Sequence, residues 1–236
     1  MFIDQDRCKR CLDCMPVCPM GAIVLAQKQV HIDYEACVEC GVCRRFGICK
    51  EDAIRQVDEI PYPRVVRAAF SDPLEAHANT GVGGRGTEEM KTNDVTDMFQ
   101  AGQIGFSIEI GRPGLGAYLS DMDKVVRKVT SLGGVFAPDN PVYPLISDRS
   151  SGALKPEVLR EKVMSAIAEF LIPEEKAMGV VKELAAFLNA ELDSVASMSV
   201  ICRADERGDC RFLKQVKQAG FAPYPNGKVN IGMARI

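Results

Sequence analysis

Apolar and polar positions alternate most clearly in the C-terminal half of the chain. Residues 104–110 carry an apolar side chain at every second position, which predicts a strand with one buried face. A helix is predicted from Ser120, because apolar residues recur three and four positions apart until Gly133 and Gly134 end the run. The same rules predict strands over 142–146, 197–202 and 229–234 and a helix over 212–219.

The predicted elements of this half fall into two similar units. Phe136–Ala137–Pro138 and Phe221–Ala222–Pro223 follow the two predicted helices in equivalent places, which indicates a repeated β-α-β unit. Such a repeat fits the split-βαβ, ferredoxin-like plait, which resembles ACT-type ligand-binding modules in topology only. Between the units, residues 156–171 and 173–192 are amphipathic and begin with proline in the first turn, so we expect a two-helix insertion over 156–192.

A segment rich in proline and glycine joins this half to the N-terminal residues. Pro61 and Pro63 predict a rigid exit from the N-terminal part, and residues 65–70 are predicted as a strand. The glycines that follow match G-x-G-x-x-G, but Pro73 lies between them and that strand, whereas a nucleotide site needs a strand that ends at the first glycine. The segment is therefore either a mobile connector or a functional loop that closes over a partner or an anionic ligand. In the second case the candidate binding residues are Gly81, Gly83, Gly84, Arg85 and Gly86.

Composition excludes several classes of protein. The chain has 236 residues, of which 47% are hydrophobic and 26% charged, so it is expected to fold and not to be disordered. The net charge of −3 gives no indication of a nucleic-acid partner. No apolar run approaches the roughly 20 residues of a membrane helix, and the N-terminus has no apolar stretch of secretory type, so we expect a cytoplasmic protein without a membrane span.

Cysteine is the residue type that indicates chemistry. The chain has 10 cysteines, and the first eight form a C-x2-C-x2-C-x3-C-P run and a C-x2-C-x2-C-x5-C run. Three thiols at this spacing can hold three corners of one iron–sulfur cube, and the fourth is carried away by the following residues to a different cube. Soft thiolates suit iron, and eight of them make two sets of four. The runs are Cys8, Cys11, Cys14 and Cys18, then Cys37, Cys40, Cys43 and Cys49.

The cysteine-rich segment is also an internal repeat. Ile3–Asp4 and Ile32–Asp33 each stand ahead of a first cysteine, and Ala22–Ile23 and Ala53–Ile54 each follow a fourth one. Each half is therefore predicted to contain a short apolar segment, a cysteine loop and a short helix that starts after the last thiol.

Residues 1–60 resemble the bacterial two-cluster 4Fe-4S ferredoxin family on these motifs. The family pattern implies two 4Fe-4S clusters, one held by Cys8, Cys11, Cys14 and Cys49 and the other by Cys37, Cys40, Cys43 and Cys18. The sequence departs from the pattern in the longer spacer before Cys49 and in Lys50, where the family usually has proline. Both departures change the loop around Cys49, so the first cluster is expected to be more solvated or differently tuned.

Two other readings of the eight cysteines are disfavoured. A disulfide framework belongs to secreted proteins, and structural zinc favours separated C-x2-C pairs over triplets with a distant fourth thiol. Cations beside the proposed ligands either raise the cluster potentials or form a docking patch for an acidic partner. These are Lys9, Arg10, Arg44, Arg45 and Lys50.

The predicted fold class is α+β, with a pseudo-two-fold dicluster ferredoxin domain over 1–60, a linker over 61–103 and a plait-like domain over 104–236. The predicted function is electron transfer as a subunit or partner of a larger anaerobic oxidoreductase, because the sequence contains no convincing catalytic set. The alternatives are an enzyme or a redox-linked regulator whose C-terminal domain binds a small molecule or an organic cofactor. Cys202 and Cys210 are expected to be inert thiols.

Overall fold

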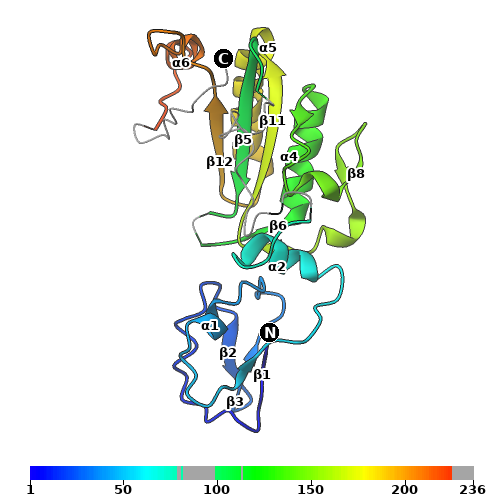
Figure 1. Ribbon diagram of the computed structural model, residues 1–236, viewed down its shortest axis with the longest axis vertical. Helices are drawn as coiled ribbons and strands as arrows, with labels where there is room; N and C mark the ends of the chain where they lie inside the picture. Colours follow the sequence, from blue (N-terminus) through cyan, green and yellow to red (C-terminus); the bar gives the residue numbers. More distant parts are fainter. Residues whose placement is uncertain (79–80, 82–98, 113, 225–236) are drawn as a thin grey trace.

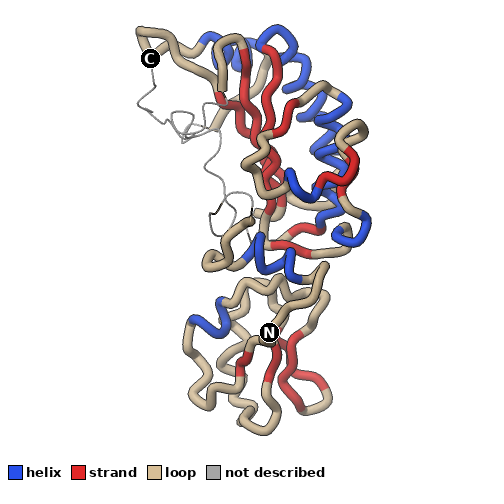
Figure 2. Tube along the Cα trace, turned by 45° about the vertical axis from the view of Figure 1, so that its right-hand side comes forward, coloured by secondary structure: helices blue, strands red, loops and turns tan. Residues whose placement is uncertain are grey.

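The computed structural model describes residues 1–78, 81, 99–112 and 114–224. Figure 1 shows two parts stacked along the longest axis, with the N-terminal residues at one end and the central sheet with its helices at the other. Helix α2 (Val65–Ser71) lies at the junction. Loops dominate the N-terminal part, whereas helices and strands dominate the rest (Figure 2).

The N-terminal part is built from two short antiparallel pairs. Strand β1 (Phe2–Ile3) pairs with β4 (Ile54–Arg55), and β2 (Ile23–Ala26) pairs with β3 (Gln29–Ile32). Helix α1 (Val42–Arg45) is a single turn. The helices predicted after each fourth cysteine are wrong, because the β-branched residues after Ala22 and Ala53 enter strands β2 and β4.

Helix α2 replaces the strand that the β-branched residues at 65–70 predict. The helical period points Val66 and Phe70 into the core of the C-terminal part, where they are 8% and 3% exposed. The same period buries Arg67 on another face, with 4% of its surface exposed. Burial on two sides therefore overrides the local preference for a strand.

The central sheet has the strand order β12-β5-β11-β7, and all neighbours are antiparallel. Strands β5 and β12 confirm the strands predicted over 104–110 and 197–202. The bounds are Gln103–Ile110 for β5, Val135–Phe136 for β7, Ala166–Pro173 for β11 and Ala196–Ile201 for β12.

The first helix of the predicted insertion over 156–192 is wrong. Residues 156–171 form the 3-10 turn η3 (Pro156–Val158), strand β10 (Lys162–Val163) and most of β11. Strand β11 is buried on both faces, so its apolar run shows no alternation and reads equally well as a helix. The second predicted helix is present as α5 (Glu174–Glu191).

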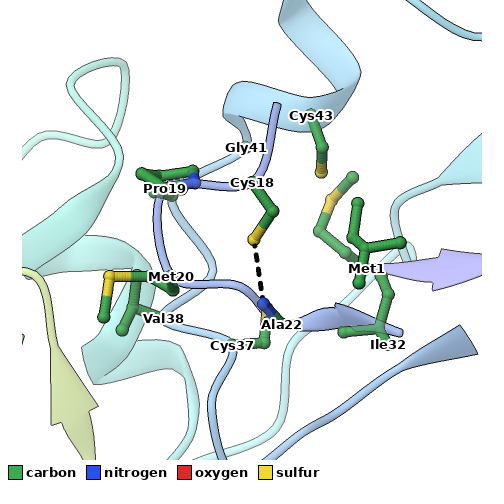
Figure 3. A pocket seen from close by; sticks show the side chains of 12 residues that line it. Met1, Cys18, Pro19, Met20, Ala22, Ile32, Cys37, Val38, Gly41 and Cys43 are labelled. Carbon is green, nitrogen blue, oxygen red and sulfur yellow. Dashed lines mark hydrogen bonds between the residues drawn. The ribbon is translucent and has the colours of Figure 1, made fainter. Parts of the chain in front are cut away.

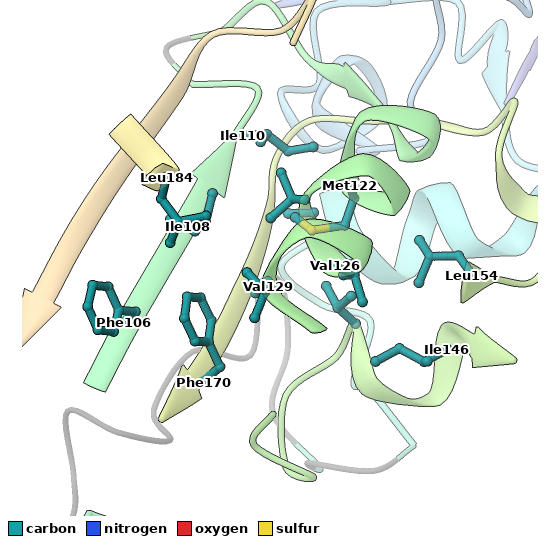
Figure 4. Close-up of a cluster of buried hydrophobic side chains, with 14 of the residues drawn as sticks. Phe106, Ile108, Ile110, Met122, Val126, Val129, Ile146, Leu154, Phe170 and Leu184 are labelled. Atoms are coloured by element: carbon teal, nitrogen blue, oxygen red, sulfur yellow. The ribbon is translucent and has the colours of Figure 1, made fainter. Parts of the chain in front are cut away.

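Two long helices cover one face of the sheet. Helix α4 (Leu119–Ser131) packs on β11 and β5, and so does α5. Val126 and Val129 of α4 and Leu184 of α5 meet Phe106 and Phe170 of the sheet in the main core (Figure 4). Helix α6 (Arg211–Gln218) follows β12 and buries Phe212 and Val216.

The two β-α-β units differ from those predicted. The structure contains β5-α4-β7 and β11-α5-β12, so the second unit ends at residue 201, before the predicted repeat around Phe221. The strand predicted over 142–146 is mostly the turn η2 (Tyr143–Leu145), which leads into β8 (Ile146–Asp148). Strand β8 pairs with β9 (Ala153–Leu154), and β6 (Ala117–Tyr118) pairs with β10. The strand predicted over 229–234 lies outside the described residues.

Candidate metal centre

One group of four thiols surrounds a small apolar cavity in the N-terminal part. Cys37, Cys40 and Cys43 line it together with Cys18, which comes from the other cysteine run (Figure 3). The cavity measures about 20 Å³. Apolar side chains complete its wall, among them Met1, Ile23, Ile32 and Val38.

The remaining four thiols form a second group. The charges of Cys11, Cys49 and Cys8 act on Cys14 and, together with burial, which has the larger effect, raise its pKa. Cys49 therefore lies with the first cysteine run although it belongs to the second. Cys18 thus lies near the second cysteine run, and Cys49 lies near the first. Cys11 is exposed, and the other three are half-buried.

Equivalent hydrogen bonds hold the backbone at both crossing points. Asp4 N donates to Ala53 O at 2.8 Å, and Asp33 N donates to Ala22 O at 2.7 Å. Ala22 N donates to Cys18 Sγ at 3.2 Å, and Ala53 N donates to Cys49 Sγ at 3.3 Å. The internal sequence repeat is thus a structural repeat, and each crossing thiol already accepts one N–H donor. Such donors stabilise sulfur that carries negative charge.

The thiols around the cavity are difficult to ionise without a cation. Burial raises the pKa of Cys37 and Cys40, and it raises that of Cys43 to about 11. Negative charges on the neighbouring cysteines raise the pKa of Cys40 and Cys43 further. The thiolates of Cys37, Cys40 and Cys43 would therefore be stabilised by bound positive charge, which the iron of a cluster would supply.

The arrangement differs from that of a single-ion site. In the part of the chain that the structure describes, no three His, Cys, Asp or Glu side chains are placed to hold one metal ion. A tetrahedral zinc would bring its sulfur ligands to within about 4 Å of one another, given Zn–S bonds of about 2.3 Å. The soft donor set of eight cysteine thiols, in two groups of four, fits 4Fe-4S clusters.

Arg67 of α2 connects the cavity group to the C-terminal part. Its guanidinium donates to the carbonyl oxygens of Tyr34 and Cys37, both at 2.8 Å. It also donates to the carboxylate of Glu161, which leads into β10, at 2.5 Å. One buried cation thus fixes the loop that carries Cys37 against the second part of the molecule. Sequence reasoning missed Arg67, because residues 65–70 read as a strand in a linker.

A second buried ion pair involves Glu39, which lies between the cavity cysteines Cys37 and Cys40 in the sequence. Glu39, which is 4% exposed, accepts hydrogen bonds from the Met1 ammonium and from the Arg64 guanidinium, both at 2.8 Å. Arg45 binds Asp72 at 2.6 Å and donates to the carbonyl oxygen of Cys40 at 2.5 Å. The loops around the cavity group are therefore held by cations that also contact residues outside the cysteine runs.

The cations named from the sequence have different surroundings. Arg45 is in the ion pair with Asp72, whereas Arg44 donates to the side chain of Gln56 and Arg10 to the carbonyl oxygen of Lys28. Lys9 and Lys50 are exposed. Arg45 is therefore a structural contact, and the exposed cations are the ones left to form a docking patch.

The glycine-rich candidate site falls almost wholly outside the described residues. Gly81 is exposed, has a φ of 68° and donates its N–H to His77 O at 2.8 Å. Gly83, Gly84, Arg85 and Gly86 lie in the part that the structure does not describe.

The expectation of inert thiols at Cys202 and Cys210 is wrong. The two residues form a disulfide with a Cα–Cα distance of 6.7 Å. The sequence signal was the charged, glycine-containing segment between them, which can close a loop.

Comparison with known proteins identifies the family that the N-terminal residues resemble. The family model of the 4Fe-4S dicluster domain matches residues 1–49. A ferredoxin-like protein in the vnf region of Azotobacter chroococcum mcd 1 is 43% identical over 63 residues, which cover 25% of this chain and 97% of that protein. The corresponding protein of Azotobacter vinelandii is 40% identical over the same shares of both chains.

A further relative is a named subunit of an enzyme. Pyruvate synthase subunit PorD of Methanothermobacter marburgensis is 43% identical over 42 residues, which cover 18% of this chain and 48% of that protein. The C-terminal part is unmatched, and no solved structure matches the chain. Among the described residues, no helix has the length and apolar character to cross a membrane.

Proposed function

Because this chain belongs, through its N-terminal residues, to the 4Fe-4S dicluster ferredoxin family, we propose that it passes single electrons through two 4Fe-4S clusters. The observation that carries the proposal is the cavity where Cys18 joins Cys37, Cys40 and Cys43. A cluster with four cysteine ligands supplies one-electron redox chemistry when bound. The protein side chains hold the cluster, exclude water and set its potential.

The proposed ligands follow the two thiol groups. Cys8, Cys11, Cys14 and Cys49 would hold the first cluster, and Cys37, Cys40, Cys43 and Cys18 the second. The second group lies toward the C-terminal part, since Arg67 binds both the Cys37 carbonyl and Glu161. The first group includes the exposed Cys11. We therefore assign electron exchange with an outside protein to the first cluster.

The cations beside Cys37 and Cys40 give the second cluster a higher potential in this proposal. Arg67 and Arg45 donate to the carbonyl oxygens of Cys37 and Cys40, so their charges lie beside the proposed ligands. Positive charge stabilises the reduced, more negative form of a cluster. Electrons would then move from the first cluster toward the second and toward the C-terminal part.

The C-terminal part is the proposed docking element for a larger anaerobic oxidoreductase. One relative is named as subunit PorD of pyruvate synthase, which supports a subunit role here. The strand order β12-β5-β11-β7, with two helices on one face, supports a ferredoxin-like plait for this part. The proposed divisions of the chain remain 1–60, 61–103 and 104–236.

Metal analysis and spectroscopy test the proposal. Protein purified without oxygen should contain about eight iron and eight sulfide per chain, as two 4Fe-4S clusters require. Low-temperature EPR after reduction should show two interacting paramagnetic clusters. Zinc in place of iron, or a colourless protein at full metal occupancy, would overturn the proposal.

Single cysteine variants test the crossing of the fourth thiols. Cys18→Ser should perturb the same EPR signal as Cys43→Ser, although Cys18 belongs to the first run. Cys49→Ser should in turn perturb the same signal as Cys14→Ser. If Cys18→Ser perturbs the signal that Cys14→Ser perturbs, each run holds its own cluster and the proposed ligand sets are wrong.

A further inference from the structure

A pocket of about 250 Å³ lies at the end of the sheet away from the N-terminal part. The start of β5 forms one wall, and Glu174, the first residue of α5, forms another. The loop between β12 and α6 supplies Cys202, Arg203 and Arg211. The floor includes the buried side chain of Phe212. A cavity of this size can hold a small metabolite.

The charges of this pocket have no partners in the described protein. Neither Arg203 nor Arg211 forms an ion pair with any described residue, and both are exposed. Two of the three acidic residues of the same loop are used elsewhere: Asp209 pairs with Lys214 at 3.0 Å, and Asp205 accepts from backbone N–H groups of the loop. The third, Glu206, is exposed and does not line the pocket. Two guanidinium groups on one pocket therefore remain available for an anion.

Glu174 narrows the chemistry of that anion. It is the carboxylate of the pocket wall, and it too has no ion pair within the described residues. A plain anion would be repelled on that side, whereas a hydroxyl or amino group could donate a hydrogen bond to the Glu174 oxygens. Two guanidinium groups and one carboxylate thus match a small dicarboxylate that carries a hydroxyl or amino substituent.

The disulfide fixes the positions of Arg203 and Arg211 relative to each other. Arg203 directly follows Cys202, and Arg211 directly follows Cys210, so the bridge between the cysteines fixes the spacing of the two guanidinium-bearing residues. Cys210 is also the N-cap of α6, where its Sγ accepts from Leu213 N at 3.4 Å. Opening the bridge would free both ends of the segment that carries Arg203.

We propose that this pocket binds a small dicarboxylate with a hydroxyl or amino group, and that the Cys202–Cys210 disulfide makes the binding depend on the thiol redox state. A dithiol reductant would open the bridge by exchange: its two sulfurs form a new disulfide, and its two electrons and two protons yield the thiols of Cys202 and Cys210. This site is independent of the proposed clusters.

Calorimetric titration of the full chain with its clusters bound tests the proposal. L-malate and L-aspartate are the probes, and succinate, which lacks the substituent, is the matched control ligand. We expect both probes to bind at least fivefold more tightly than succinate. Arg203→Ala and Arg211→Ala should each weaken malate binding about tenfold, because each removes a charge-assisted contact.

Arg207→Ala is the matched control variant. Arg207 lies in the same loop and is exposed, but it does not line the pocket. It should change the dissociation constant less than twofold. If Arg207→Ala weakened malate binding as much as the two pocket variants do, the loss would come from the general charge of the loop. The proposed site would then be wrong. Unchanged binding in both pocket variants, or no binding by any probe, would also overturn the site.

Reduction of the wild-type protein tests the redox part. After treatment with dithiothreitol, with two new thiols per chain verified by thiol counting, malate should bind about fivefold more weakly. The double variant Cys202→Ser with Cys210→Ser should show the same weaker malate binding. If this variant does not fold, the measurement on the reduced wild-type protein decides the question by itself. Equal affinity before and after reduction would overturn the redox dependence. Visible absorbance of the clusters, recorded in each sample, separates these outcomes from a failure of the proposed electron transfer.

Discussion

The two parts of the molecule reach a stable structure by opposite means. The C-terminal part has a large apolar core, in which Phe106, Ile108 and Phe170 are 0% exposed. The core of the N-terminal part is a handful of small and medium side chains beside half-buried cysteines. About 60 residues bury too little apolar surface for much stability. We therefore expect the first part, unlike the second, to depend on bound clusters for its stability.

Loss of the clusters should give the largest difference between the two parts. Removing iron and sulfide leaves the four thiols around the cavity with neither positive charge nor covalent links between the loops. Metal-binding free energy is folding free energy in such a site, so residues 1–60 should unfold. Hydrogen exchange should show loss of protection in β2 and β3 but retained protection in β5 and β11. Loss of protection in both parts together would contradict the comparison.

Truncating a core side chain of the C-terminal part should destabilise that part and leave the N-terminal part unchanged. Phe170→Ala removes a ring that stacks on Phe106, with ring centroids 5.3 Å apart. It should lower the free energy of unfolding of the C-terminal part by about 3–5 kcal/mol. Urea unfolding followed by circular dichroism measures the loss, and cluster absorbance should stay unchanged at low urea.

The matched control for that variant is Val135→Ala, also in the sheet. Val135 is 63% exposed, so its truncation should cost less than about 0.5 kcal/mol. If Phe170→Ala lowered the cluster absorbance in the absence of urea, the stability of the N-terminal part would depend on the C-terminal core. That result would contradict the comparison.

The junction between the parts depends on a buried ion pair. Arg67→Met removes the donor to the Tyr34 and Cys37 carbonyls and leaves the Glu161 carboxylate buried without its partner. The expected loss of stability is about 3 kcal/mol. Redox titration should also show a lower potential for the second cluster, because a positive charge beside the Cys37 loop is gone.

Two further variants sharpen the junction test. Arg44→Met is a control, since Arg44 is exposed and contacts only the Gln56 side chain among the hydrogen bonds described for it. Arg67→Met combined with Glu161→Gln should be more stable than Arg67→Met alone, because the uncompensated buried charge is removed. A double variant no more stable than the single one would show that Arg67 acts through the carbonyls alone.

The same comparison explains what the sequence could predict. The cysteine spacing is a local pattern, and each cysteine loop begins with an equivalent local hydrogen bond, from Cys8 N to Asp4 O at 3.0 Å and from Cys37 N to Asp33 O at 2.9 Å. The resemblance to dicluster ferredoxins is confirmed for the N-terminal residues. Strands β5 and β12 were predictable too, because one face of each is clearly more polar than the other.

The failures have a common physical cause. Strand β11 and helix α2 are buried on more than one side, so tertiary contacts and not local periodicity decide their conformation. Arg67 pairs with Glu161 across a large sequence separation, and no local pattern records such a contact. The bridge between Cys202 and Cys210 likewise depends on where β12 ends and α6 begins. Contacts between residues far apart in the sequence were therefore the least predictable.

The smallest expected effect concerns acid, and it is measured in helix α4 of the C-terminal part. Asp121 of α4 lies under the chain that follows α5, where it accepts from Ser194 Oγ and N and from Lys124 Nζ. Burial by itself would raise the pKa of Asp121, but the bonds from Ser194 and Lys124 outweigh it and hold the pKa below the ordinary value of 3.8. The unfolded chain therefore binds a proton more readily than the folded one.

The sign of the pH dependence follows from that lowered pKa. The stabilising contribution of Asp121 is complete above pH of about 4 and is lost as the pH falls through the folded pKa. Asp121→Asn should abolish this dependence and cost about 1 kcal/mol near neutral pH. Hydrogen exchange of the α4 amides at pH 5 and pH 3 measures it. Asp193→Asn is the control, because the Asp193 side chain is 96% exposed and lies 3.5 Å from the same lysine. An equal change in both variants would assign the effect to the charge of Lys124 and not to the buried contacts of Asp121.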